Sequence, residues 1–278
     1  MKIKFTLSEL VAYGLVIMGA LMMLIPFYFI FIFATHDNQA ILSVPPPMWF
    51  GDQLSVNLNA LIGYLPHFWK NLSWSFYIAL ITTILNLLFC SLAGYAFAMF
   101  EFKHKNRLFV FVMATMMLPA FLSMIPTALI MSWLGWMNTP KALYIPMAVG
   151  AMGIFLMRQY ISSAIPRELI EAARMDGCGE FSIFFRIIFP LITPALGTLG
   201  LVTFIGQWNN FMGPLVVMND MEMFTLPLAL RSLQGSTALI PYGAMFTGIA
   251  IAVLPLMILF AISSRQLIAG LTSGAVKG

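Results

Sequence analysis

The chain has 278 residues, of which 61% are hydrophobic and only 9% are charged, whereas an ordinary soluble domain has about 25% charged residues. This composition excludes a soluble globular domain and is typical of a membrane protein with several spanning helices. The formal net charge of +4 at pH 7 reflects an excess of lysine and arginine on one side of the membrane and gives no reason to expect nucleic acid as a partner.

Long apolar runs alternate with short polar segments along the chain. A membrane-spanning helix needs about 17–25 mainly apolar residues, which predicts six spans at about 10–34, 72–98, 108–132, 142–161, 195–218 and 242–263. We expect the first span to be retained, because its apolar stretch is longer than the roughly 7–15 residues of a signal peptide core. The predicted fold is an all-α membrane protein in which residues 1–278 form a single polytopic transmembrane domain.

The basic residues indicate which ends of the spans face the cytoplasm, because cytoplasmic loops carry an excess of lysine and arginine. If the N-terminus lies inside, the outer segments contain only Lys70, Lys141 and Arg231, and every other basic residue falls on the inner side. We therefore expect a multi-pass protein of the cell (inner or plasma) membrane with both termini in the cytoplasm.

Charged residues fall between or beside the apolar runs, and Arg158, near the inner end of the fourth span, can extend its side chain to the membrane surface. An ionisable group inside the membrane is a functional site by default, so the absence of carboxylates there argues against a stand-alone secondary carrier. Cys90 and Cys178 lack the spacing of metal ligands and the three histidines are scattered, so we expect no metal site. The chain also lacks a Gly-x-x-x-x-Gly-Lys-Ser/Thr phosphate loop, so we expect it not to be an enzyme.

The longest polar segment of the predicted inner side runs from Arg158 to about Pro194. Pro166 suits the first turn of a helix, and Gly177 and Gly179 are placed to end that helix. A second amphipathic segment follows, in which the apolar residues at i, i+3, i+4 and i+7 are Phe181, Phe184, Phe185 and Ile188. Two short helices of this kind either cap the bundle or form a docking surface for another protein, and the residues alone leave both interpretations open.

The spacing of several residues in this segment resembles the EAA loop of ABC importer permeases. The matching residues are Glu171-Ala172-Ala173, Gly177, Ile187 and Phe189-Pro190, with Phe189 where the family usually has leucine. Further segments resemble the MalG-like permease subunits of the carbohydrate-uptake branch. They are Phe155–Tyr160, Ile165-Pro166, Arg174–Gly177, Trp208–Phe211, Pro214-Leu215 and Gly270–Gly278. The resemblance covers most of the chain, from the first span to the last residue.

The resemblance implies the fold of an ABC type I importer permease, with a cytoplasmic coupling loop at about 162–190. It also implies three kinds of protein partner and one cargo. The partners are a second homologous permease subunit, two ATPase subunits and an extracytoplasmic solute-binding protein, and the cargo is a sugar. ATP and Mg would be bound by the ATPase subunits, so this chain would bind no cofactor and would contact membrane lipid. Closure of the ATPase pair would move the EAA helix and switch the spans between inward-facing and outward-facing states.

The resemblance assigns the contact with the ATPase to the coupling loop. The expected coupling residues are Glu171, Ala172, Ala173, Arg174, Asp176, Gly177 and Pro190. Glu171 would offer a carboxylate to a basic groove, and Ala172 and Ala173 would allow close approach of the partner. Gly177 would supply the turn, and the apolar face with Phe181, Phe184 and Phe185 would anchor the helix. We also expect the C-terminal tail to contact the ATPase pair through Gly274 and Lys277.

Polar side chains inside the predicted spans are candidates for a substrate path, because sugar hydroxyl groups need amide and hydroxyl partners. The candidates are Asn86, Thr127, Thr203, Gln207, Asn209 and Asn210, with Trp208 offering an aromatic face. Such side chains also join one helix to another in membranes, and both interpretations stay open.

Other functions stay open as well. The same architecture could import a polyol or glycerol phosphate in place of a sugar or oligosaccharide. In a different class, the chain could be a stand-alone secondary carrier, or a membrane scaffold whose inner segment recruits a soluble protein. Co-purification with a second permease and an ATPase would distinguish an importer subunit from a scaffold.

Overall fold

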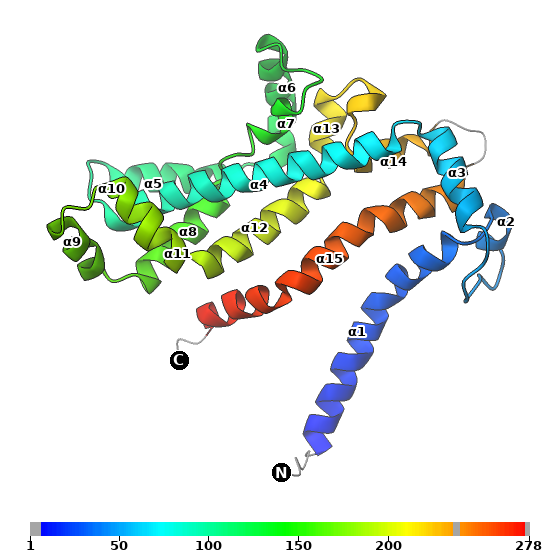
Figure 1. The fold of residues 1–278 in the computed structure, drawn as a ribbon, viewed down its shortest axis with the longest axis horizontal. Helices are drawn as coiled ribbons and strands as arrows, with labels where there is room; N and C mark the ends of the chain where they lie inside the picture. The colour runs from blue at the N-terminus through cyan, green and yellow to red at the C-terminus, as the bar shows by residue number, and fades with distance from the viewer. Residues whose placement is uncertain (1–6, 236–239, 276–278) are drawn as a thin grey trace. The chain divides into compact units, whose positions relative to one another are not determined.

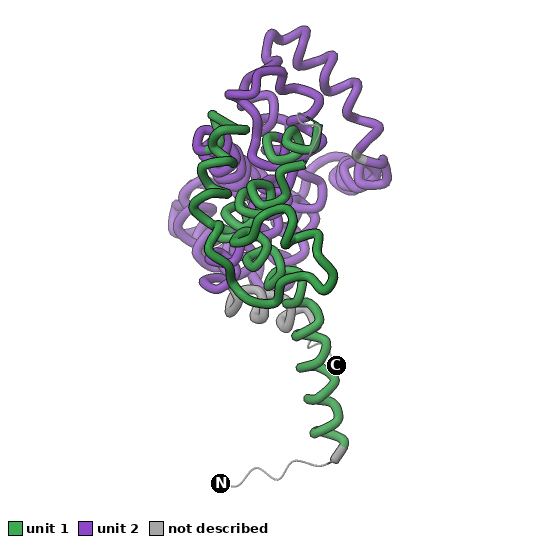
Figure 2. The backbone as a smooth tube through the Cα atoms, turned by 90° about the vertical axis from the view of Figure 1, so that its right-hand side faces the viewer, with its two compact units in different colours: residues 1–68, 229–255 green, residues 69–228, 256–278 purple. Residues whose placement is uncertain are grey.

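The computed structural model describes residues 7–235 and 240–275, and the secondary structure of these residues is helical, as the sequence predicts. Figure 1 shows the helices in chain order. The chain forms two compact units, one made of residues 1–68 and 229–255 and the other of residues 69–228 and 256–278 (Figure 2). Three helices contribute residues to both units: α4 (Phe68–Met99), α14 (Leu226–Ser232) and α15 (Tyr242–Ala275).

The first unit contains three further helices, α1 (Leu7–Phe33), α2 (Asn38–Ile41) and α3 (Leu54–Tyr64). Buried polar side chains join the ends of its helices. Asn57 of α3 donates hydrogen bonds from Nδ2 to the carbonyl oxygens of Ala34 (2.9 Å) and His36 (2.8 Å), just after α1. Thr247 of α15 donates to the same Ala34 carbonyl at 3.2 Å. These bonds provide acceptors for side chains that would otherwise lose their contact with water.

The second unit contains most of the shorter helices. They are α5 (Lys105–Ala114), α6 (Met124–Trp133), α7 (Lys141–Tyr144), α8 (Ala151–Ala164), α9 (Arg167–Met175), α10 (Glu180–Ile183), α11 (Phe189–Leu191), α12 (Thr193–Trp208) and α13 (Met212–Val217). A 3-10 turn at Met221–Met223 precedes α14. The helices α8 and α12 lie alongside α4 (Figure 1).

Glycines allow α4 and α8 to approach each other closely. A Cβ atom at Gly94 of α4 would lie 2.5 Å from the Cβ of Met157 in α8, and a Cβ at Gly153 of α8 would lie 2.7 Å from the Sγ of Cys90. Small residues at such crossings bring helix backbones into contact, which is how packing is achieved between helices in a membrane.

An apolar core joins α9 and α10 to α4, α8 and α12. Ile170 and Ala173 of α9 pack in the same buried cluster as Met157 and Ile161 of α8 and Phe184, which follows α10. The polar segment that the sequence placed on the inner side is therefore folded onto the apolar helices by its own buried residues.

Three helices in the described part of the chain are long and apolar enough to cross a membrane on their own: α1, α4 and the part of α15 that ends at Ser263. Two bent pairs, α5 with α6 and Glu180–Leu191 with α12, raise the number to five if each pair is one span. The expected all-helical fold is confirmed, whereas the count of six spans and the single domain stay predictions.

Three of the predicted spans are interrupted. The third is divided near Pro119, between α5 and α6, and the fourth contains a turn around Pro146, between α7 and α8. The fifth is divided between α12 and α13. A proline has no backbone N–H and disfavours helical geometry in the residue before it, so the apolar runs overestimate the length of the third and fourth helices.

Candidate functional site

The candidate site is built around α9, which follows Pro166 at one end of the second unit (Figure 1). Pro166 has φ −63° and ψ 139° and caps the helix from outside, one position earlier than the first-turn position that the sequence predicted. Ile170 and Ala173 face the core of the unit, while Glu168 and Glu171 are exposed. The helix therefore presents a charged surface on an apolar support.

Gly177 ends α9 as the sequence predicts. Its φ is +78°, in the left-handed region that glycine adopts without steric cost. The N–H of Gly177 donates to the carbonyl of Arg174, and the N–H of Cys178 donates to the carbonyl of Ala173, both at 3.0 Å. This pair of bonds is a Schellman motif. Gly179 has a different role from the one predicted, because it precedes α10 with φ −72° and ψ 155°.

The apolar face after Gly179 differs from the predicted one. Phe181 is 75% exposed and Phe185 is also exposed, so of the three expected phenylalanine anchors only Phe184 is buried. The other residues fully buried in this segment are Ile183, Ile188 and Ile192. Residues Phe184–Ile188 form a π-helical turn, which is wider than an α-helical turn and changes which side chains point to the core.

The predicted coupling residues fall into two groups. The exposed group consists of Glu171, Ala172, Arg174, Asp176, Gly177 and Pro190. Ala173, in contrast, is 7% exposed and lies in the core cluster, so its small side chain fits the chain's own helices and offers no surface to a partner. Pro190 lies in α11, shortly before a bend of 79° that leads into α12.

Two residues of the site carried no signal in the sequence, Tyr95 and Glu180. One carboxylate oxygen of Glu180 accepts a hydrogen bond from Nε of Arg174 at 2.7 Å, and the other accepts one from the hydroxyl of Tyr95 at 3.0 Å. The Arg174 guanidinium also lies over the ring of Phe100, 5.4 Å from its centroid. The Glu180 carboxylate raises the pKa of Arg174 further, so this pair is charged at all physiological pH values.

A second group of charged side chains lies at the start of α9. Oε1 of Glu101 accepts from Nζ of Lys105 at 3.0 Å and from the guanidinium of Arg167 at 3.4 Å. Lys105, and to a smaller degree Arg167, holds the pKa of the Glu101 carboxyl below its usual range. Between the two ion pairs lies a cavity of about 450 Å³ lined by Glu101, Arg167, Glu171, Arg174 and Glu180, together with apolar residues at the end of α4.

The predicted substrate-path residues are not gathered in one place. Asn86 of α4 is buried; its Oδ1 accepts from the hydroxyl of Thr203 in α12 at 3.3 Å, and its Nδ2 donates to the carbonyl of Met147 at 3.2 Å. The Thr203–Asn86 hydrogen bond joins two helices, and the role of both residues in a substrate path stays a prediction. Trp208 is buried and stacks on Phe204, with a centroid distance of 5.9 Å and an interplanar angle of 16°.

Most of the remaining path residues lie at the break after α12. Nδ2 of Asn210 donates to Gln207 at 3.3 Å, and its Oδ1 accepts from the N–H of Gly213 at 3.1 Å. Asn209 is exposed and bonds back to the carbonyl of Ile205 at 3.0 Å. Asn210 also lines a largely apolar cavity of about 370 Å³ with Thr127, Pro146 and residues of α13. Asn210 and Thr127 thus line the same cavity.

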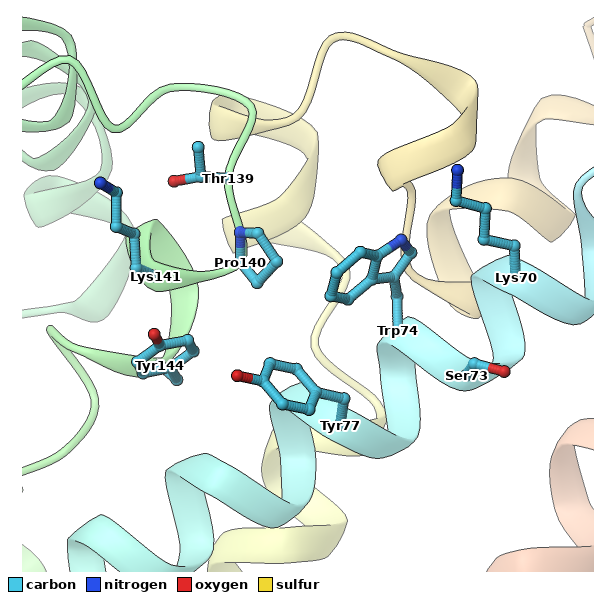
Figure 3. A pocket seen from close by; sticks show the side chains of 8 residues that line it. All are labelled: Lys70, Ser73, Trp74, Tyr77, Thr139, Pro140, Lys141 and Tyr144. Atoms are coloured by element: carbon cyan, nitrogen blue, oxygen red, sulfur yellow. The ribbon is translucent and has the colours of Figure 1, made fainter.

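A wider pocket of about 550 Å³ lies between the start of α4 and α7 (Figure 3). Trp74 and Tyr77 of α4 face Tyr144 of α7 across it, and the rings of Tyr77 and Tyr144 meet edge to face at 6.2 Å. Lys141 lines the same pocket and lies over the ring of Trp136 at 5.1 Å. No sequence pattern indicated this pocket, because its two sides are far apart in the chain.

The predicted tail contact cannot be placed in full. Gly274 belongs to the last turns of α15, which extends to Ala275, so residues 270–275 continue a helix. Lys277 lies outside the described residues.

Comparison with known proteins gives a consistent result for the whole chain. Residues 88–272 match the family described as binding-protein-dependent transport system inner membrane component. The chain is 39% identical over 215 residues to the arabinooligosaccharides transport system permease protein AraQ of Halalkalibacterium halodurans, covering 76% of this chain and 75% of the relative. It is 33% identical over 275 residues to the lactose transport system permease protein LacG of Rhizobium radiobacter, covering 98% of this chain and 97% of the relative.

A solved structure has the same fold. It is the crystal structure of a bacterial ABC transporter involved in the import of the acidic polysaccharide alginate, and it matches with a TM-score of 0.81 over 95% of this chain and 99% of the other. The sequence identity is 22%, so the likeness establishes the fold alone. The predicted ABC importer permease fold is confirmed.

Proposed function

Because this chain belongs to the family of binding-protein-dependent transport system inner membrane components, we propose that it is the permease subunit of an ATP-driven importer for a sugar or oligosaccharide. Its relatives at 39% and 33% identity are named for arabinooligosaccharide and lactose transport. A neutral cargo also suits helices whose apolar cavity is lined by Asn210 and Thr127 and by no charged residue.

The observation that carries the mechanism is the charged face of α9. Glu171 and Arg174 are exposed on a short helix, and Asp176 is exposed directly after it. A glycine motif ends this helix and an apolar core supports it. Such a helix is a rigid element that another protein can move as a unit, which coupling between two states requires. In this proposal α9 lies in a groove of an ATPase subunit, and Glu171 pairs with a basic residue there.

The proposal includes the arrangement of the complete transporter. This chain pairs with a second homologous permease, two ATPase subunits bind ATP and Mg on the cytoplasmic side, and a solute-binding protein delivers the cargo from outside. Both termini and α9 lie in the cytoplasm, as the distribution of basic residues indicates. The chain contributes no residue to ATP hydrolysis.

Reconstitution of the complete complex in proteoliposomes tests the proposal. We expect ATP hydrolysis that the solute-binding protein stimulates, and uptake of arabinotriose or lactose in preference to glycerol 3-phosphate. Preferential uptake of glycerol 3-phosphate would instead establish the polyol-phosphate alternative. Failure of the chain to co-purify with any ATPase or second permease would contradict the importer assignment.

The charge of Glu171 provides a variant test. Glu171→Lys should abolish stimulated hydrolysis or assembly, because it reverses the charge offered to the groove, while the purified subunit stays folded. Glu168→Lys is the matched control, since Glu168 is an exposed carboxylate of the same helix outside the EAA motif. Equal activity of both variants would contradict the role of Glu171.

A further inference from the structure

We propose that the Glu180 carboxylate connects α9 mechanically to α4 and α12, so that a displacement of α9 moves both helices. Tyr95 and Arg174 are its two hydrogen-bond partners. Glu180 is then a positioning residue of the transport cycle, and the inference rests on the importer function proposed above. We call the three side chains Tyr95, Arg174 and Glu180 the Glu180 link.

The Glu180 link connects three separate helices through one carboxylate. Arg174 lies in the last turn of α9, Glu180 is the first residue of α10, and Tyr95 lies near the end of α4. Each oxygen of the carboxylate has a different partner, at 2.7 Å for Nε of Arg174 and 3.0 Å for the hydroxyl of Tyr95. A hydrogen bond to an ionised group is stronger than one between neutral groups, so the two bonds join the end of α9 to α4 through Glu180.

Tyr95 is held firmly on the α4 side. Its side chain is 4% exposed and its ring packs against Phe100 at 5.3 Å and Phe184 at 5.7 Å between centroids. A hydroxyl on so constrained a ring has little freedom to follow Glu180 unless α4 moves too. In this proposal a movement of Glu180 is therefore passed on to α4 through Tyr95.

The other contacts of α9 are less suited to this task. Ile170 and Ala173 are held by apolar packing, which is not directional. The Glu101–Arg167 pair is 3.4 Å long between side chains that are 61% and 71% exposed, whereas the Arg174–Glu180 pair is 2.7 Å long between side chains that are 40% and 41% exposed. Water weakens both pairs, and it weakens the more exposed Glu101–Arg167 pair more. Of these three contacts, the Glu180 link is the one that combines direction with a buried partner.

The path beyond Glu180 leads to the helices that carry candidate cargo residues. The segment after Glu180 is fixed by the fully buried side chains of Ile183, Phe184, Ile188 and Ile192 before the chain turns by 79° into α12. In α12, Thr203 meets Asn86 of α4. Both helices that share this contact are thus attached to the Glu180 link.

Amide hydrogen exchange of the isolated chain in nanodiscs tests whether the Glu180 link holds α9 in place. Tyr95→Phe removes one hydroxyl and leaves the ring, and Glu180→Gln removes the charge. Each should increase exchange in the last turn of α9 about fivefold, the change that corresponds to loss of one hydrogen bond of about 1 kcal/mol. Tyr160→Phe is the matched control, because Tyr160 packs against the same core, and it should leave α9 exchange unchanged. Unchanged exchange in both link variants overturns the inference.

The number of ATP molecules hydrolysed per sugar imported by the reconstituted complex tests whether the Glu180 link couples hydrolysis to transport. Tyr95→Phe should raise the number of ATP molecules hydrolysed per arabinotriose or lactose imported, because hydrolysis would then proceed without the movement of α4 that uptake needs. A residue with a merely structural role would lower hydrolysis and uptake together. Because Tyr95 and Glu180 share one hydrogen bond, the loss of coupling in the double variant Tyr95→Phe/Glu180→Gln should be smaller than the sum of the losses in the two single variants.

The two experiments separate the inference from the proposed function. A wild-type complex that imports none of the sugars refutes the proposed cargo, whereas the exchange measurement still decides whether the Glu180 link holds α9. Faster exchange in the variants with an unchanged ratio of ATP to sugar overturns the inference while the importer function stands.

Discussion

At the scale of single residues, the end of α9 depends on the conformation of one glycine. Gly177 has φ +78°, and a Cβ atom added there would have nothing within 4 Å, so the cost of a side chain is conformational. Gly177→Ala should destabilise the subunit by about 1 kcal/mol, the lower end of the penalty for an L-residue in the left-handed region. Chemical denaturation in detergent micelles would measure it.

Gly179→Ala is the control for this prediction. Gly179 also has open space around it, but its φ is −72°, a value that alanine adopts without strain. We expect a change near zero. If both alanine variants were equally stable, the Schellman motif would contribute nothing to the end of α9.

Glu101 provides a prediction on pH. Lys105, and to a smaller degree Arg167, holds the pKa of its carboxyl below the usual value. The contact with Lys105 therefore stabilises the folded state fully above the unfolded-state pKa of about 4.3, and this effect is lost as the pH falls through the lower folded-state pKa. The protection of the amides at the start of α5, where Lys105 lies, relative to the intrinsic exchange rate at each pH should therefore fall as the solution is acidified below about pH 4. Glu101→Gln should show the reduced protection already at neutral pH, and a variant that retained the wild-type pH dependence would rule out Glu101 as its source.

At the scale of helices, the crossing of α4 and α8 depends on glycine for a different reason. A Cβ at Gly94 would lie 2.5 Å from the Cβ of Met157 and 2.8 Å from the backbone N of Arg158, so α8 itself would have to move. Gly94→Ala should cost about 1–3 kcal/mol, as overpacking does in other cores. The thermal midpoint of the purified subunit would report the loss.

Gly206→Ala tests the same substitution where there is room. Gly206 lies in α12 with nothing within 4 Å of its Cβ position, so alanine should stabilise the helix by about 0.5–1 kcal/mol. The two substitutions should thus shift the midpoint in opposite directions. A loss of equal size at both positions would mean that the α4–α8 distance is not set by Gly94.

The sequence predicted those helix features that depend on local chemistry. Gly177 ends α9 as expected, because the left-handed turn needs only the glycine itself and the carbonyls of Ala173 and Arg174 in the last turn of the same helix. The apolar face after it was misassigned at Phe181 and Phe185, because the period of a π-helical turn is not visible in a pattern of apolar residues. Glu180 and Tyr95 are 85 positions apart, and nothing local to either residue indicates that they meet.

At the scale of the whole molecule, the orientation in the membrane can be tested with a natural residue. Cys178 is exposed just after α9 and Cys90 is buried in α4, so a thiol reagent should modify one position in the native chain. The distribution of basic residues predicts that this position faces the cytoplasm. A membrane-impermeant maleimide should therefore label the chain in inside-out vesicles and leave it unlabelled in right-side-out vesicles.

The experiment should use the chain expressed without the other subunits, because an ATPase seated on α9 would shield Cys178. Ser43→Cys in a Cys178→Ser background supplies the opposite control, since Ser43 is exposed in the predicted first outer segment and should be labelled only in right-side-out vesicles. Labelling of Cys178 from the outside would reverse the orientation. In that case α9 would lie on the side of the membrane without ATP, and no ATPase could move it.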